Sequence, residues 1–263
     1  EVENEDLREI VVSSIVSIFY KLYSYSWGPR LEHILRHTVF ALVNKEGSTL
    51  ADIPEMLTNE SFRQSIVDKL EDPVSRNFWL HEFTGMSPQL RSEATAPILN
   101  KVGQFLSSKV IREIIDKPKS KINLRRAMDE GKIILCNLAQ GRLGEDNSSL
   151  LGAMIVTKLQ LAAMSRIDQP EEQRRDFFLF IDEFQNFATD AFGKILSEAR
   201  KYHLNLTLAN QYVAQLPKEV QSGIFGNCGS LISFVVGAED ARVLEREYSE
   251  IYETNDLVAL DKF

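Results

Sequence analysis

Two acidic side chains, Asp182 and Glu183, directly follow the apolar run Phe177–Ile181. A continuous apolar run of this length is typical of a strand buried on both faces, which places both carboxylates at the carboxyl edge of a parallel sheet. Asp182 is suited to hold the water shell of a Mg²⁺ ion that bridges the β- and γ-phosphates of a nucleotide. Glu183 is suited to orient and polarise the attacking water. This is the pattern of a Walker B strand, although a strand that merely ends in a solvated acidic turn has the same sequence.

Two polar residues further along the chain fit the same site. Residues 190–202 have helical periodicity, and Arg200 lies at the border of the apolar face. A border arginine can reach an adjacent subunit and stabilise charge on a transferred phosphoryl group, whereas the alternative is an ordinary surface arginine. The next predicted strand, residues 205–211, ends in Asn210 and Gln211 beside the Walker B end. We therefore predict Glu183, Gln211 and Arg200 as catalytic, with Asp182, Glu183 and Gln211 binding the nucleotide.

The elements that must position these residues form two regions with different predicted secondary structure. Up to about Glu130 the chain reads as short helices, with N-cap residues at Asn59, Asp72 and Ser87, the last two followed by proline. After Gly131 the pattern predicts strands that alternate with helices, which favours an α/β fold with a parallel sheet covered on both faces. The predicted strands are residues 132–138, 177–181, 205–211 and 230–237, and the predicted helices are residues 148–165, 190–202 and 218–225.

The stretch DEFQNFATDAFGKILSEARKYHLNLTLANQYVAQL (182–216) resembles the motor core of the HerA/FtsK-type ATPases, and within them most closely the TraD/TraG-like coupling proteins of type IV secretion and conjugation. The resemblance implies a partial RecA-like P-loop NTPase core over residues 129–263, preceded by an inserted all-α subdomain over residues 27–128 and by a helix leading from the motor core over residues 1–26. In this family the acid pair is followed by an arginine finger and by a strand ending in glutamine, which here are Arg200 and Gln211.

The same resemblance implies an ATP- and Mg²⁺-dependent DNA translocase that works as a homo-oligomeric ring, a hexamer by analogy. One subunit would supply Asp182, Glu183 and Gln211, and the next would supply Arg200. DNA would be the substrate, and relaxase or secretion-channel proteins would bind through the helical subdomain. The expected location is cytoplasmic, with any tether to the inner membrane in a missing N-terminal part.

No phosphate-binding loop of the form G-x-x-x-x-G-K-[ST] is present, because the pairs Gly131-Lys132 and Gly193-Lys194 are both followed by isoleucine. In the resembled family this loop precedes the helical insert, so we expect the chain to be the later part of a longer protein and to be inactive alone. A degenerate, non-hydrolysing relative is the alternative, and the intact acid pair argues against it. Two other functions stay open: a HerA-like motor in DNA repair or genome handling, and a non-catalytic adaptor with a relic ATPase half.

The remaining features are less specific. A net charge of −8 excludes a general nucleic-acid-binding surface, so any DNA contact needs a local basic segment. Lys119 and Lys121 lie in the most basic stretch, and Arg142 follows the first predicted strand, so these three are candidates for DNA or inter-subunit contact, with a solvated linker or loop as the alternative. The sequence contains no run of about 18 apolar residues, so we expect no membrane-spanning segment in it. His33 and His37 have metal-ligand spacing but are expected to be ordinary surface or helix–helix histidines, while Cys136 and Cys228 are expected to be buried thiols.

Overall fold

The computed structural model describes residues 5–189, 192–248 and 251–261. The chain divides into two compact units. The first comprises the residues up to Asn123 together with Leu138–Leu150, and the second comprises Leu124–Asn137 together with the residues from Leu151 onward.

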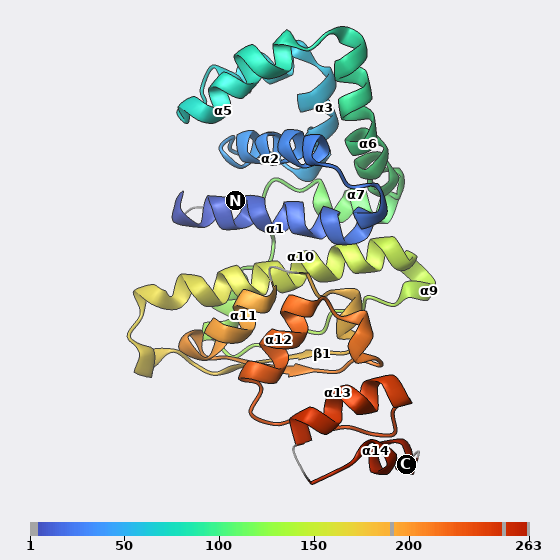
Figure 1. Cartoon of the computed structure of the whole chain (residues 1–263). Helices are drawn as coiled ribbons and strands as arrows, with labels where there is room; N and C mark the ends of the chain where they lie inside the picture. The colour runs from blue at the N-terminus through green and yellow to red at the C-terminus, as the bar shows by residue number, and fades with distance from the viewer. Residues whose placement is uncertain (1–4, 190–191, 249–250, 262–263) are drawn as a thin grey trace. The chain divides into compact units, whose positions relative to one another are not determined.

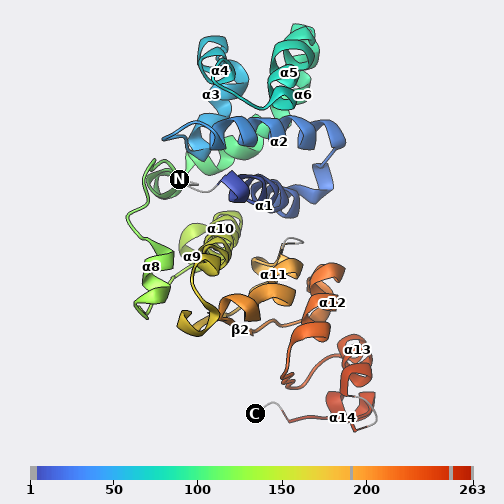
Figure 2. The ribbon, with the colours of Figure 1, turned by 90° about the vertical axis from the view of Figure 1, so that its left-hand side faces the viewer.

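The first unit is helical, as the sequence predicts. Helix α2 contacts α1, α3 and α6, and α3 also contacts α4 and α6 (Figures 1 and 2). A π-helical segment, Phe78–Phe83, follows α5. The α-helices are α1 (Glu5–Tyr23), α2 (Pro29–Val43), α3 (Ile53–Thr58), α4 (Glu60–Val67), α5 (Pro73–Asn77), α6 (Pro88–Ser107), α7 (Lys109–Ile115) and the one-turn α9 (Gln140–Leu143).

The three predicted N-caps are confirmed. The side chains of Asn59, Asp72 and Ser87 accept hydrogen bonds from backbone N–H groups in the first turns of α4, α5 and α6 respectively. Each satisfies one of the N–H groups that a helix start leaves without an intrahelical partner, a contribution of about 1 kcal/mol. The helix starts of this unit are thus determined locally.

His33 and His37 of α2 pack against the π-helical segment. The His37 ring stacks on the Phe78 ring at a centroid distance of 4.1 Å, and its Nδ1 lies 3.3 Å from the Ser75 hydroxyl. His33 Nε2 lies 3.4 Å from a carboxylate oxygen of Glu82. Both rings therefore serve helix packing, as expected. Burial is the main cause that lowers the pKa of His37 to about 4, and His33 acts in the same direction.

The second unit holds the sheet. Strands β1 (Phe177–Ile181) and β2 (Leu204–Leu208) pair in parallel, with Phe177 opposite Leu204 and Ile181 opposite Leu208. Helices α10 and α11 lie on one side of the sheet (Figure 1), and α12 packs against α11. The other side leaves Phe178 and Phe180 62% and 72% exposed, so the predicted cover on both faces is not found among the described residues. The helices are α8 (Leu124–Asp129), α10 (Glu145–Met164, whose first residues belong to the first unit), α11 (Phe192–Glu198), α12 (Lys218–Asn227), α13 (Ala238–Tyr248) and α14 (Thr254–Val258).

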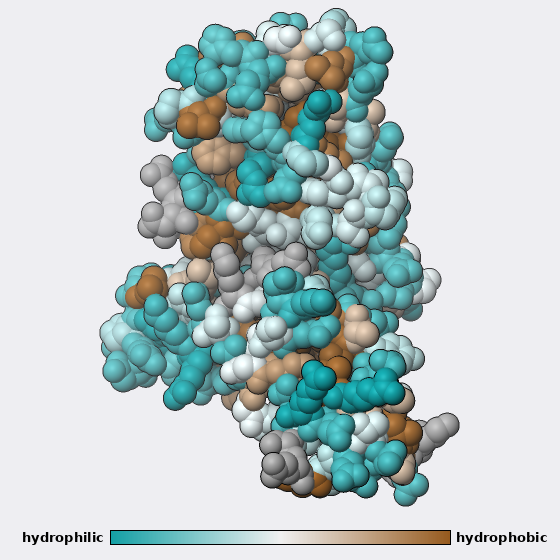
Figure 3. Space-filling view, in the orientation of Figure 1, coloured by the Kyte–Doolittle hydropathy of each residue, from teal (hydrophilic) through white to brown (hydrophobic). Residues whose placement is uncertain are grey.

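The strands predicted at residues 132–138 and 230–237 do not form. β1 and β2 pair only with each other among the residues that the structure describes, so the outer edge of each strand is open and neither segment pairs with it. A short apolar run becomes a strand only where it pairs with a sheet edge and a covering layer buries its side chains. Without that pairing, four large apolar side chains of these segments stay exposed, namely Ile133, Leu135, Ile232 and Phe234. Figure 3 shows hydrophobic residues as separate patches on a largely hydrophilic face.

Cys136 and Cys228 are exposed, so the prediction of buried thiols is wrong. Cys136 lies within the first of these segments, and Cys228 lies two residues before the second. The prediction was based on the apolar sequence around each cysteine, and those neighbours do not enclose the thiols.

Helix α10 and the 3₁₀ turn after it, Glu145–Asp168, are long and apolar enough to cross a membrane by length and composition. Among the described residues this is the one such helix, and 44% of the apolar window is buried inside the protein. A core helix passes the same test, and on α10 Phe187 lies against Gly152 so closely that a Cβ there would meet the ring.

The stacking of His37 predicts a pH dependence of stability. Because the pKa of His37 falls from the ordinary 6.5 to about 4 on folding, the unfolded chain binds the extra proton between these values. The free energy of unfolding should therefore be highest above pH 6.5 and should decrease as the pH falls through about 4. Urea denaturation between pH 7 and pH 4 should show a smaller decrease for His37→Gln than for the unchanged protein. His81→Gln, at an exposed histidine, is the control and should keep the full decrease; equal slopes for all three proteins would contradict the assignment.

Candidate functional site

The acid pair occupies a tight turn at the end of β1. Glu183 has the left-handed backbone conformation, with φ 50° and ψ 43°, which costs a non-glycine residue roughly 1–2 kcal/mol. The ladder continues past the strand, because Ala209 N–H donates to the Ile181 carbonyl at 2.9 Å and Phe184 N–H donates to the Ala209 carbonyl at 2.8 Å. Phe184 is fully buried. The turn is therefore held by backbone pairing before it and by an aromatic anchor after it.

The structure brings Glu183 and Gln211 together. Gln211 Nε2 lies 2.7 and 3.0 Å from the two carboxylate oxygens of Glu183, and Gln185 Nε2 donates to one of them at 2.6 Å. Asp182 is exposed, and its Oδ1 accepts a hydrogen bond from Glu183 N–H at 2.9 Å. The two parallel strands thus deliver the acid pair and the amide to one edge, as the sequence predicts.

Arg200 lies at the opposite end of β2. It belongs to the 3₁₀ turn Ala199–Tyr202 that precedes the strand, and it is exposed, while Ala199 and Tyr202 are buried. The five residues of β2 span about 16 Å at the usual rise per residue. An arginine side chain cannot bridge that length, so within one chain Arg200 does not meet Glu183.

The three candidate contact residues are also exposed. Lys119 and Lys121 lie in the connection between α7 and α8, and Arg142 lies in α9 rather than in the predicted loop. All three belong to the first unit, whereas the acid pair belongs to the second.

Sequence reasoning missed a buried arginine near the start of the sheet. Arg166, in the turn after α10, is fully buried and donates hydrogen bonds to the carbonyls of Tyr202 and Arg175. Its Nε lies 3.2 Å from Asp129 Oδ1, an ion pair whose angle falls outside hydrogen-bond geometry. The only signal in the sequence is an arginine directly after an apolar helix, which is also typical of an exposed helix end.

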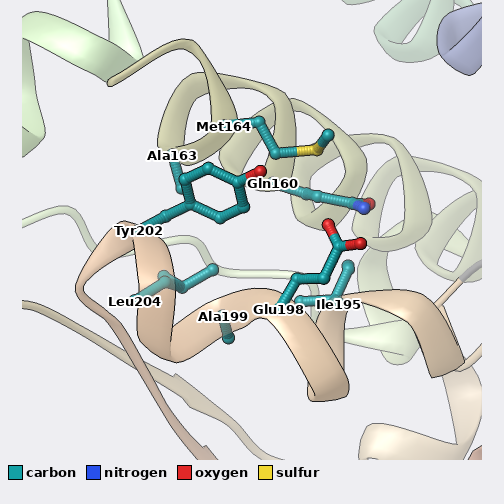
Figure 4. A pocket seen from close by; sticks show the side chains of 8 residues that line it. All are labelled: Gln160, Ala163, Met164, Ile195, Glu198, Ala199, Tyr202 and Leu204. Carbon is teal, nitrogen blue, oxygen red and sulfur yellow. The ribbon is translucent and has the colours of Figure 1, made fainter. Parts of the chain in front are cut away.

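A small hollow lies between α10 and the turn before β2. Figure 4 shows Tyr202, Leu204 and Ala199 on one side and Gln160, Ala163 and Met164 on the other. It has room for about one water molecule, which excludes a nucleotide there. The acid edge of the sheet therefore remains the candidate site.

Comparison with known proteins gives one match. A family model described as "TraM recognition site of TraD and TraG" matches residues 176–252, a range that includes β1, β2, Asp182, Glu183, Arg200 and Gln211. The match covers 77 of the 263 residues, and over this segment the chain is similar to the TraD and TraG proteins. No curated protein and no solved structure matches the chain.

The left-handed turn predicts an unusual order of stability among substitutions. Glu183→Gly and Glu183→Ala remove the same carboxylate, but only glycine adopts a positive φ without strain. Glu183→Gly should therefore be more stable than Glu183→Ala by about 1 kcal/mol in urea denaturation. At Asn186, in the 3₁₀ turn with ordinary helical geometry, the order should reverse, with alanine the more stable. The same order at both positions would contradict the strained turn.

Proposed function

We propose that this chain is the Walker B half of an ATP-hydrolysing motor that moves DNA in a conjugative coupling protein. The observation that supports it best is the Glu183 carboxylate held by Gln211 at the carboxyl edge of two parallel strands. Open α/β sheets bind ligands at this edge. The loop that would hold the phosphates is not among these residues, so the proposed site needs a phosphate-binding loop from outside them.

The donor set fits magnesium and a nucleotide. Asp182 offers exposed carboxylate oxygens, of which Oδ1 accepts one backbone hydrogen bond, and Mg²⁺ prefers carboxylates reached directly or through water. When bound, Mg²⁺ would neutralise charge on the phosphates.

Glu183 has one acceptor position left for a water molecule. A carboxylate offers about four lone-pair positions, and Gln211 and Gln185 fill three of them. The carboxylate is therefore held in one orientation while it can still accept a proton from a bound water. This is the geometry that a general base requires.

Arg200 would act in a neighbouring copy. Because it is exposed at the far end of β2, its guanidinium is available to stabilise phosphoryl charge across a subunit joint. Shared sites of this kind require a closed assembly of copies, for which we propose a ring, hexameric by analogy. DNA would pass through the ring and contact exposed basic residues such as Arg142, Lys119 and Lys121.

A second candidate function follows from the matched family description. That description concerns recognition of a partner, TraM, and we propose that a protein of that kind binds within residues 176–252. In a non-catalytic adaptor this binding would be the whole function. A HerA-like role in DNA repair would keep the hydrolysis and lack the partner.

The water-orienting role of Glu183 is tested in the protein that joins this chain to its phosphate-binding loop. Glu183→Gln keeps the size of the side chain but replaces one acceptor oxygen by an NH2 donor and removes the base, so ATP turnover should fall by about 100-fold or more while nucleotide binding persists. Steady-state hydrolysis and fluorescent-nucleotide titration measure the two quantities. Glu198→Gln makes the same change at an exposed carboxylate on α11 and should leave turnover within about twofold. Full turnover by Glu183→Gln would remove it from the mechanism.

The shared site predicts rescue by mixing. Arg200→Ala and Glu183→Gln should each be inactive alone, but in mixed rings roughly a quarter of the joints pair an intact Glu183 with an intact Arg200. Hydrolysis should therefore reappear on mixing and should be highest near equal amounts. Lys201→Ala, at the next exposed cation, should be active without mixing. Failure of rescue at every ratio would contradict a site shared between subunits.

A further inference from the structure

The buried Arg166 guanidinium joins the two strands at their amino ends. Nη1 donates to the Tyr202 carbonyl at 3.2 Å, and Nη2 donates to the Arg175 carbonyl. Arg175 lies two residues before Phe177, where β1 begins, and Tyr202 lies two residues before Leu204, where β2 begins.

These two carbonyls are at equivalent positions in the register. Phe177 and Leu204 are opposite each other in the ladder. Continued two residues toward the amino ends, the same register sets Arg175 opposite Tyr202. A single rigid, planar guanidinium that donates to both carbonyls fits only if the two strands keep this alignment. Any slip of one strand moves one carbonyl by about 3.3 Å per residue, out of hydrogen-bond range.

The charge of Arg166 is compensated by the nearby carboxylate of Asp129. Asp129 of α8 lies 3.2 Å from Nε, and Arg125 holds Asp168, in the same turn as Arg166, with a hydrogen bond of 2.7 Å. Burial is the main cause that lowers the pKa of Arg166, with Asp129 opposing it, and an arginine stays charged at any physiological pH. A buried charge tolerates little change in geometry, because each lost partner leaves it uncompensated.

We propose that Arg166 is a positioning residue that sets the register of β1 and β2 and thereby places Glu183 against Gln211. Side chains along a strand alternate between faces, so a slip by one residue would turn Gln211 away from the carboxylate. The register itself is a property of this chain alone. Only the consequence for hydrolysis depends on the function proposed above.

Cysteine cross-linking on the exposed face of the sheet measures the register directly. Cys136 and Cys228 are exposed and are first replaced by serine. The pair Phe180→Cys with Thr207→Cys occupies opposite positions, and the pair Phe178→Cys with Thr207→Cys is offset by two residues. Opposite residues on neighbouring strands lie about 4.8 Å apart, within disulfide range, and the offset pair lies about 8 Å apart, outside it. With Arg166 intact, the opposite pair should oxidise much faster than the offset pair.

Replacing Arg166 should remove this preference. In Arg166→Met, the ratio of the two oxidation rates should fall by at least about tenfold, since two hydrogen bonds from a charged group are lost. Arg166→Lys keeps the charge beside Asp129 but cannot donate to both carbonyls with the same planar fork, so its ratio should fall as well. This variant decides the question if Arg166→Met does not fold.

Arg125→Met is the matched control. It removes a guanidinium from the same network, yet Arg125 has no hydrogen bond to either strand among the described contacts. Its ratio should equal that of the unchanged protein. An unchanged ratio in Arg166→Lys, or an equal fall in Arg125→Met, would overturn the proposal.

Hydrolysis provides a second and separable measurement. In the protein with its phosphate-binding loop, Arg166→Lys should lower kcat more than it weakens nucleotide affinity, since the loop holds the phosphates while the register places Gln211 against Glu183. Altered cross-linking without any ATP turnover in the unchanged protein would contradict the proposed function alone. Normal turnover with unaltered cross-linking in Arg166→Lys would contradict the role of Arg166 alone.

Discussion

The parallel pairing of β1 with β2 is the constraint on which the candidate site depends. Parallel strands end at the same edge, so the residues that follow Ile181 and Leu208 must meet there. Glu183 and Gln211 come from segments 28 residues apart, and their contact follows from this alignment. At the amino ends the same alignment brings Asp176 within 3.1 Å of both His203 Nδ1 and the Asn205 amide nitrogen. The contacts at both ends therefore depend on one register.

Backbone strain at Glu183 is offset by what surrounds it. The left-handed turn aims the carboxylate at Gln211, and the next residue, Phe184, is fully buried and packs against Phe192 with ring centroids 4.7 Å apart. Burying a phenylalanine contributes about 1.5–3 kcal/mol, which is enough to offset the roughly 1–2 kcal/mol cost of one left-handed residue. The chain thus keeps a strained acid at the sheet edge because its neighbour is anchored beneath the edge.

Features that depend on residues close in sequence were predictable. The N-caps at Asn59, Asp72 and Ser87 need only their own first turns, and the meeting of Glu183 with Gln211 needs only two strands joined by one helix. Whether residues 132–138 and 230–237 form strands depends on pairing with residues far away in the sequence, and the exposure of Cys136 depends on the same pairing. The periodicity of a segment carries no information on such pairing. Arg166 was missed for the same reason, because its partners lie on three segments that converge only in the folded chain. The chemical roles of Asp182, Glu183, Arg200 and Gln211 remain predictions.

The sparse apolar packing of this sheet explains why a buried charge occurs at its start. Phe178 and Phe180 are largely exposed, so apolar burial on that face contributes little to the pairing of β1 with β2. Apolar contacts are also non-directional and tolerate a slip of two residues, which keeps every side chain on its own face. Hydrogen bonds from one guanidinium to two carbonyls do not tolerate that slip. A buried arginine is costly for stability, but here it discriminates between registers that hydrophobic patterning alone leaves nearly equal.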